Sequence, residues 1–114
     1  NGTESVDYAA SAGQVALAET DGKADKGILC CGTGIGISIA ANKIPGIRAA
    51  VVSDEFCAKA TREHNDSNIL CMGGRVISEE KAVELTKIFL NTAFEGGRHQ
   101  RRIDQIAAIE RGEL

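Results

Sequence analysis

The residues with the clearest chemistry form a stretch in which a cysteine precedes three alternating glycines. The stretch is Cys31-Gly32-Thr33-Gly34-Ile35-Gly36, and it lies between an apolar run and the apolar start of a helix. Glycines at alternate positions allow a sharp turn that brings several backbone N–H groups towards one point, where they can hold an anion. Those donors and the helix dipole favour a thiolate, which predicts that Cys31 acts as a base. The alternative is a small buried thiol, which we expect for Cys30, Cys57 and Cys71.

Four further side chains are candidates for proton transfer or substrate binding. His64 ends a predicted helix beside Asn65-Asp66, where it suits a general acid or a donor to a sugar oxygen; a solvated capping histidine is the simpler alternative. Arg98 and Arg102 lie one helical turn apart, which suits a phosphate clamp, and Arg75 follows a predicted strand. Solvated arginines would give the same pattern. With the thiol and the glycine loop, these groups describe proton transfer on a phosphorylated substrate.

Two nucleotide-binding loops are alternatives for the glycine-rich stretch. Asp54, at the end of the next predicted strand, would support a nicotinamide-cofactor domain, but that fingerprint needs G-x-G-x-x-G where this chain has single-residue gaps. A Walker loop is excluded because no Gly-Lys-Ser or Gly-Lys-Thr follows. We therefore expect no nucleotide cofactor.

Alternating strands and helices must position these residues. Strands are predicted at 27–31, 47–52 and 68–74. Helices are predicted at about 9–20, at 35–43 and from about His99 to Arg111. Two further helices are predicted from a Ser53 N-cap to about Glu63 and from a Ser78 N-cap to about Leu90. This order predicts an α/β fold of Rossmann-like class, a three-layer αβα sandwich with a parallel sheet and a site at the carboxyl ends of the strands. Alternation along the first strand puts Cys30 and Cys31 on opposite faces.

Composition predicts a single soluble domain over residues 1–114. The chain has 43% hydrophobic residues and a net charge of -3, so no basic field favours nucleic acid as a partner. It has no apolar stretch long enough to cross a bilayer, which predicts no membrane association. Its four cysteines form no CxxC pair, which indicates a reducing, cytoplasmic compartment.

From the glycine loop onwards, the sequence resembles the B-type ribose-5-phosphate isomerases, part of a family that also includes galactose-6-phosphate and allose-6-phosphate isomerases. The motifs that carry the resemblance stand in the family's order: Cys31 to Lys43, Pro45-Gly46-Ile47-Arg48-Ala49, Arg62 to Asn68, Gly73-Gly74-Arg75-Val76, and Glu95-Gly96-Gly97-Arg98-His99-Gln100-x-Arg102. They cover nearly the whole chain.

The resemblance implies interconversion of ribose 5-phosphate and ribulose 5-phosphate through a cis-enediolate, without a metal. It implies Cys31 as the base, Thr33 as a carrier of protons between the substrate oxygens, and His64 as the acid that opens the furanose ring. It implies substrate-binding roles for Gly32, Thr33, Gly34, Ile35, Gly36, Asn65, Arg75, Arg98 and Arg102, the loop N–H groups holding the enediolate oxygen. A homodimer or homotetramer with sites at the dimer interface is also implied, so some residues serve the neighbouring subunit.

The same resemblance leaves the sugar open. The predicted polar turn His64-Asn65-Asp66 and the Arg98/Arg102 pair resemble the ribose-phosphate branch. Allose or galactose 6-phosphate, or a non-catalytic sugar-phosphate-binding subunit, are the alternatives. The family begins with a strand that ends in an Asp-His pair, a helix and a second strand, none of which is found in this chain. We therefore expect the chain by itself to be incompletely folded or poorly active.

Overall fold

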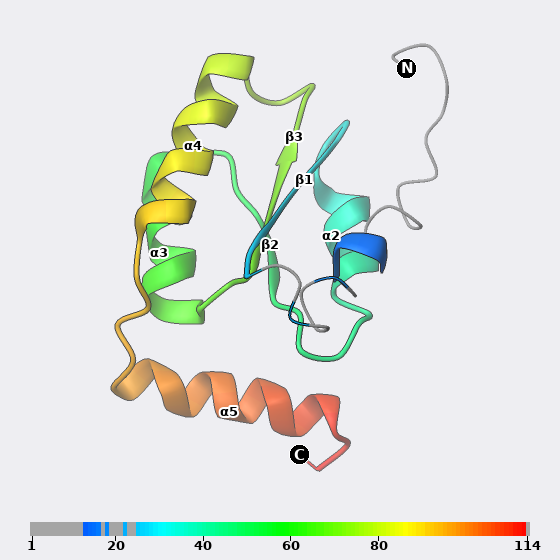
Figure 1. The fold of residues 1–114 in the computed structure, drawn as a ribbon, viewed down its shortest axis with the longest axis vertical. Helices are drawn as coiled ribbons and strands as arrows, with labels where there is room; N and C mark the ends of the chain where they lie inside the picture. The colour runs from blue at the N-terminus through cyan, green and yellow to red at the C-terminus, as the bar shows by residue number, and fades with distance from the viewer. Residues whose placement is uncertain (1–12, 17, 19–21, 23–24, 114) are drawn as a thin grey trace.

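The computed structural model describes residues 13–16, 18, 22 and 25–113. Within them the chain runs β1 (Gly27–Cys31), α2 (Ile35–Ala41), β2 (Ala49–Val51), α3 (Glu55–Asn65), β3 (Ile69–Gly73), α4 (Glu79–Asn91) and α5 (Arg98–Glu110) (Figure 1). Residues 13–16 and 18 are helical, as predicted, whereas the rest of the predicted first helix lies outside the described residues. None of the described helices combines the length and apolarity needed to cross a membrane.

The three strands form a parallel sheet in the order β1-β3-β2. The central strand β3 reads Ile-Leu-Cys-Met-Gly and is buried along its whole length, as expected for an uninterrupted apolar run in a parallel sheet. The register pairs Gly27 with Ile69 and Cys31 with Gly73. The predicted site loop therefore leaves the sheet directly beside the carboxyl end of the central strand.

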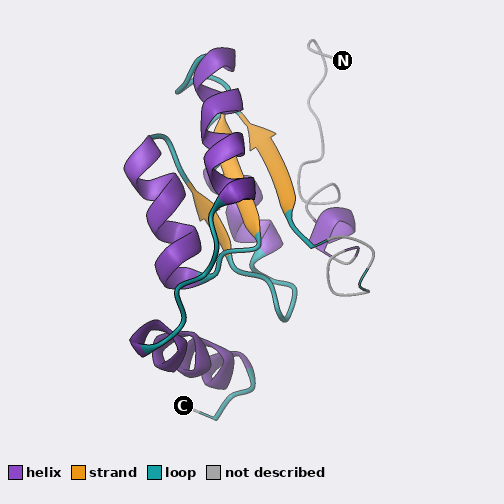
Figure 2. Ribbon diagram, turned by 60° about the vertical axis from the view of Figure 1, so that its left-hand side comes forward, coloured by secondary structure: helices purple, strands orange, loops and turns teal. Residues whose placement is uncertain are grey.

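Helices cover both faces of the sheet, which confirms the predicted three-layer αβα architecture (Figure 2). Successive β3 side chains point to opposite faces, so Ile69 and Cys71 belong to one core and Leu70 and Met72 to the other. The first core is completed by Ala16, Leu29, Ile37, Ala41 and Ile47, and the second by Val52, Ala58, Leu85 and Phe89. Helix α2 thus packs on one face and α3 with α4 on the other.

Helix α3 differs from its prediction at both ends. Its N-cap is Asp54, whose Oδ1 accepts the Cys57 N–H at 2.8 Å, so Ser53 as the cap was wrong. The helix continues through His64 and Asn65, and Asp66 ends it with a left-handed φ of 47°. The predicted polar turn is therefore mostly the last helical turn. The Ser78 cap of α4 is confirmed, because its hydroxyl accepts the Lys81 N–H at 3.1 Å.

The loop between α2 and β2 is bridged by the Asn42 side chain. Asn42 accepts the Ala49 N–H at 2.8 Å and donates to the Ala49 carbonyl at 3.0 Å. Helix α2 ends at Ala41 rather than the predicted Lys43, and β2 begins at Ala49 rather than the predicted Ile47.

The prediction of buried thiols holds for Cys71 and is wrong for Cys30 and Cys57, which are exposed. Strand β1 is an edge of the described sheet, so its Cys30 side chain is not enclosed by a neighbouring described strand. Cys57 lies in the first turn of α3, one helical residue before the inward-facing Ala58. Alternation does place Cys30 and Cys31 on opposite faces, since Cys31 packs against the α2 core and Cys30 lines a cavity with Ile77 and Ala82.

Helix α5 lies apart from the sheet, beyond the end at which the strands begin (Figure 1). Near its carboxyl end, both oxygens of Glu110 accept the Gly46 N–H, at 3.0 and 3.1 Å. At its start, His99 is buried against α3. These two contacts fix the direction of the helix, and with it the positions of Arg98 and Arg102.

Candidate active site

The Cys31 thiol lies where β1 ends and the glycine loop turns into α2. Its Sγ accepts the Gly34 N–H at 3.1 Å. The loop is locked to the turn after β3, because the Gly74 N–H donates to the Cys31 carbonyl at 2.8 Å and the Arg75 N–H donates to the Gly32 carbonyl at 3.0 Å. The structure thus brings Cys31, the loop and Arg75 together, as predicted.

Two glycines allow the loop to lie directly on the end of β3. Gly34 has a φ of +82°, and a Cβ there would lie 2.9 Å from the Met72 carbonyl carbon. A Cβ on Gly73 would lie 2.7 Å from both the carbonyl carbon and the oxygen of Thr33. Both contacts are with backbone, which cannot rotate away as a side chain can. The absence of side chains at these positions therefore sets how closely the loop approaches the sheet.

The loop lowers the pKa of Cys31. Burial raises this pKa, but the N–H groups of Ile37, Gly34 and Thr33 and the Thr33 hydroxyl stabilise the thiolate and together outweigh burial. By contrast, burial and the Cys31 charge raise the pKa of Cys30, and burial above all raises that of Cys71 to about 12. Cys31 is therefore the sheet thiol best suited to act as a base near neutral pH.

Replacing Thr33 by Val should raise the pKa of Cys31, because valine has no hydroxyl to donate. Below that pKa a smaller fraction of the thiol is then ionised, so alkylation of Cys31 at pH 7 should slow about two- to tenfold, as expected for one lost hydrogen bond of roughly 0.5–1.5 kcal/mol. The measurement is the rate of iodoacetamide labelling of the Cys31 peptide by mass spectrometry across pH.

Ser38→Ala is the matched control for this labelling experiment. The Ser38 hydroxyl donates to the Ile35 carbonyl at 2.6 Å and is not a donor to the thiol. Its loss should leave the labelling profile unchanged. Equal profiles for Thr33→Val and the original chain would contradict the role given to the Thr33 hydroxyl.

A second group of candidate residues lies at the end of α3 and is held in place by arginines. Buried Arg62 donates from Nη1 to Asp66 Oδ1 at 2.9 Å and to the Ser67 carbonyl at 2.8 Å. Its Nε donates to the Thr92 carbonyl at 3.1 Å, which ties α3 to the segment that leads into α5. Arg48 Nη2 donates to the Asp66 carbonyl at 2.9 Å. The last turn of α3, with His64 and Asn65, is therefore rigidly placed.

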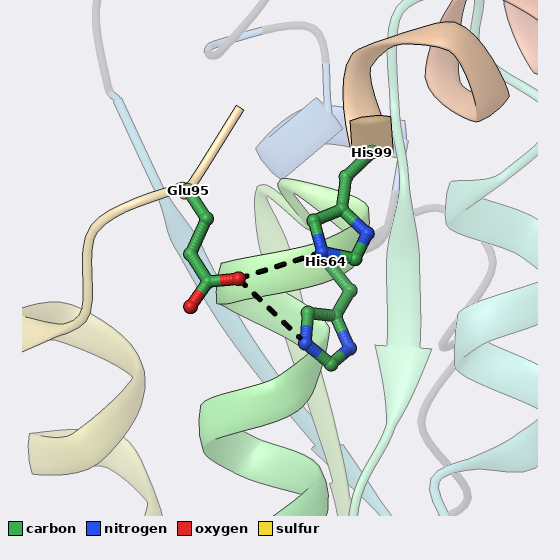
Figure 3. Close-up of side chains that lie close together, drawn as sticks. All are labelled: His64, Glu95 and His99. Carbon is green, nitrogen blue, oxygen red and sulfur yellow. Dashed lines mark ion pairs between the residues drawn. The ribbon is translucent and has the colours of Figure 1, made fainter. Parts of the chain in front are cut away.

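His64 stacks on a histidine that the sequence analysis did not single out. The imidazole rings of His64 and His99 have centroids 4.3 Å apart and planes 18° apart (Figure 3). Glu95 Oε1 lies 3.4 Å from His99 Nε2 and 3.9 Å from His64 Nε2. The spacing of Glu95 and His99, four residues apart across the start of α5, was the available signal. That spacing could not show that the start of α5 packs against the end of α3.

The arginine pair belongs to this second group. Arg98 and Arg102 are exposed on the first turns of α5, where neither has an ion pair within the described part of the chain. Their spacing of four residues places them on one face, as predicted. Together with His64 and Asn65 they lie at the end of the domain where β3 begins.

One copy of the chain therefore keeps the candidate residues in two separate groups. Cys31, the residues from Gly32 to Gly36 and Arg75 lie at the carboxyl end of the sheet, and the histidine-arginine group lies at its amino end. The five residues of β3 alone separate these ends by about 13 Å, at roughly 3.3 Å per step. A cavity of about 490 Å³ at the amino end is lined by Asn65, Arg48 and Ile106 but not by Cys31.

Comparison with known proteins gives one consistent result. Residues 1–106 match the family model described as Ribose/Galactose Isomerase. The chain is 52% identical to ribose-5-phosphate isomerase B of Escherichia coli over 95% of its length and 72% of that protein. It is similar to the solved structure of ribose-5-phosphate isomerase B from Clostridium thermocellum, with 49% identity and a TM-score of 0.94, covering 97% of this chain and 75% of that one. It is also similar to the structure of the type B enzyme from Trypanosoma cruzi, with 48% identity and a TM-score of 0.93, covering 96% of this chain and 73% of that one. The chain thus spans about three quarters of these proteins.

Proposed function

The chain belongs to the ribose/galactose isomerase family, and from this membership we propose that it interconverts ribose 5-phosphate and ribulose 5-phosphate. The observation that carries the proposal is the Cys31 thiol, whose pKa is lowered by the glycine loop that encloses it. An aldose-ketose isomerase needs a base that is ionised near neutral pH and lies beside donors for a developing oxyanion. The loop supplies both in one turn of chain.

In this mechanism Cys31 moves one proton between adjacent carbons. The thiolate takes the proton from C2 of the open-chain aldose, and the electron pair forms the C1–C2 double bond as negative charge moves to O1. The same thiol returns the proton to C1, while the Thr33 hydroxyl carries a proton from O2 to O1. The Thr33, Gly34 and Ile37 N–H groups stabilise the thiolate, and the Ile35 N–H donates to the Thr33 hydroxyl at 3.2 Å. The enediolate oxygen is therefore held by the remaining loop N–H groups, those of Gly32 and Gly36.

We propose that the complete site forms between two copies of the chain. In a furanose the ring oxygen is bonded to C1, so the acid that opens the ring and the base at C2 must contact nearly neighbouring atoms. Cys31 and His64 lie at opposite ends of one sheet and meet this requirement only across a subunit interface. Exposed isoleucines beside each group, Ile35 and Ile39 on α2 and Ile106 and Ile109 on α5, supply apolar surface for that interface. Asn65 then binds a sugar hydroxyl, and Arg75, Arg98 and Arg102 contribute to binding of the substrate and its phosphate.

The test of the proposed function is isomerisation of ribose 5-phosphate, allose 6-phosphate and galactose 6-phosphate in deuterated water, followed by proton NMR. We expect the fastest turnover with ribose 5-phosphate, with deuterium entering at the carbons that exchange the proton. Preference for a six-carbon substrate would move the chain to the allose or galactose branch. Sugar-phosphate binding without exchange would instead indicate a non-catalytic subunit.

Replacing His64 by Gln should slow ribose 5-phosphate isomerisation about 100-fold, the lower end of what a general acid contributes. Glutamine keeps a hydrogen-bonding side chain but cannot deliver a proton to the ring oxygen. Erythrose 4-phosphate, which has no free hydroxyl that can close a furanose, should be isomerised by His64→Gln nearly as fast as by the original chain. Equal losses on both substrates would contradict a ring-opening role.

We also propose that the enzyme works in a reducing, cytoplasmic compartment. The four cysteines are free thiols, and Cys31 must stay reduced to serve as a base. The expected partner is the sugar phosphate, held by the arginines.

A further inference from the structure

Outside the thiol site, the described residues best arranged to hold a ligand are His64, Glu95 and His99. Their nearest donor atoms, two imidazole nitrogens and a carboxylate oxygen, all lie within 4.8 Å of one another (Figure 3). We propose that these three side chains bind Zn²⁺ and that zinc thereby inhibits the enzyme. The inhibitory consequence rests on the proposed function of His64, whereas the metal site itself does not.

The donor set selects the class of metal. Two imidazoles and one carboxylate suit zinc and related transition metals, whereas Mg²⁺ and Ca²⁺ prefer oxygen ligands throughout. Three protein ligands leave the fourth tetrahedral position to water or to an oxygen of a bound sugar phosphate. The site is therefore of the open kind, which exchanges its metal more readily than a closed four-ligand site.

Two of the three distances between donor atoms are close to those that zinc requires, and the two imidazole nitrogens lie within 4.8 Å of each other. Zinc bonds of about 2.0–2.1 Å in tetrahedral geometry place neighbouring donor atoms about 3.3 Å apart. His99 Nε2 and Glu95 Oε1 already lie 3.4 Å apart, and His64 Nε2 lies 3.9 Å from the same oxygen. The stacked rings must open so that both lone pairs point at one ion. The 43% exposed His64 and the 52% exposed Glu95 can make this adjustment, while His99, 7% exposed, stays fixed.

In the proposed inhibition, metal binding and ring opening compete for His64 Nε2, which we take as the nitrogen that donates the proton to the ring oxygen. Zinc binds the lone pair of the neutral imidazole, so a His64 that holds zinc through Nε2 cannot carry a proton on that nitrogen. The outer support of the site is incomplete, because the buried Nδ1 of His99 has no hydrogen-bond partner among the described residues. Such a partner commonly improves metal affinity 10–100-fold, so this site should be weaker and reversible. These are the properties of an inhibitory site rather than of a structural zinc.

The chain permits an unambiguous measurement, because His64 and His99 are its only histidines. We expect a ZnCl₂ titration of ¹⁵N-labelled protein to shift the Nε2 resonances of both rings together, with EDTA reversing the change. Zinc held only by the exposed thiols would leave these resonances in place, and that result would overturn the proposal. The histidine resonances can be measured without any enzymatic activity, so this experiment tests the zinc site separately from the proposed function.

Two variants locate the carboxylate ligand. Glu95→Gln should weaken zinc binding at least tenfold in the histidine titration, since even the loss of an outer-shell partner has that effect. The side chain of Glu95 is exposed, so the variant should fold. Glu80→Gln, at an exposed position in the first turn of α4, removes the same charge elsewhere and should leave zinc binding unchanged. Equal zinc affinity in Glu95→Gln and Glu80→Gln would rule out the proposed ligand set.

A turnover assay tests whether zinc binding at this site inhibits catalysis. Zinc should inhibit ribose 5-phosphate turnover over the same concentration range in which it shifts the two histidines, and inhibition should need higher zinc in Glu95→Gln. Shifted histidines with unchanged turnover would support the metal site and contradict the role of His64 in ring opening.

Discussion

Cys31→Ala should lose isomerase activity by about 10³- to 10⁴-fold, the upper range of what a positioned general base contributes. Alanine keeps the backbone N–H groups of the loop but removes the one thiol whose pKa those donors lower. Sugar-phosphate binding should therefore persist while proton exchange at C2 disappears. The measurements are turnover in deuterated water and calorimetric titration with ribose 5-phosphate.

Cys30→Ala is the matched control, because the neighbouring thiol faces the other side of the sheet and has a raised pKa. It should keep nearly full activity. Mixing Cys31→Ala with His64→Gln under conditions that exchange subunits should then restore activity, since each mixed dimer contains one site with both groups intact. No recovery in verified mixed dimers would show that Cys31 and His64 do not share an intersubunit site.

Gly73→Ala should damage both folding and activity, although residue 73 has no side chain that could act on a substrate. Its Cβ would lie 2.7 Å from the Thr33 carbonyl group, so the loop must move off the end of β3. Overpacking of this kind costs about 1–3 kcal/mol of unfolding free energy. A displacement near 1 Å at a reacting group can cost about 100-fold in rate. The measurements are thermal denaturation by circular dichroism and isomerase turnover.

Gly32→Ala provides the comparison within the same loop. A Cβ at residue 32 would meet only the Arg75 side chain, at an ordinary contact distance of 3.7 Å. This variant should keep its melting temperature close to that of the original chain. If Gly73→Ala were as stable and active as Gly32→Ala, close backbone packing would not be what positions the loop.

The loop and its neighbouring strand could be predicted from the sequence because their determinants are local. Five consecutive apolar or small residues at 27–31 predict a strand, and the alternating glycines after Cys31 predict a turn with converging N–H groups. The structure has β1 at these residues and a Gly34 N–H donating to the thiol. The Ser78 cap was equally local, since one hydroxyl needs only the N–H three residues ahead.

The local sequence did not show which of two neighbouring residues caps a helix, or whether a cysteine in it is buried. Ser53 and Asp54 can both cap a helix, and the structure uses Asp54. Cys30 and Cys57 lie in apolar sequence and yet are exposed, because exposure depends on strand order and on which face of a helix meets the core. Sequence spacing fixes which side chains share a face but not what covers that face.

The sequence by itself determined the alternation of strands and helices, the thiol beside the glycine loop and the family resemblance, because these reside in short runs of residues. Only the tertiary structure decided that β3 separates Cys31 from His64, and that α5 returns to stack His99 on His64 beside Glu95. Both results depend on sheet order and on hydrogen bonds between residues far apart in the chain, such as Arg62 to Thr92. The separation is the observation from which we propose a site shared between subunits, and the stack provides the arrangement to which we assign zinc.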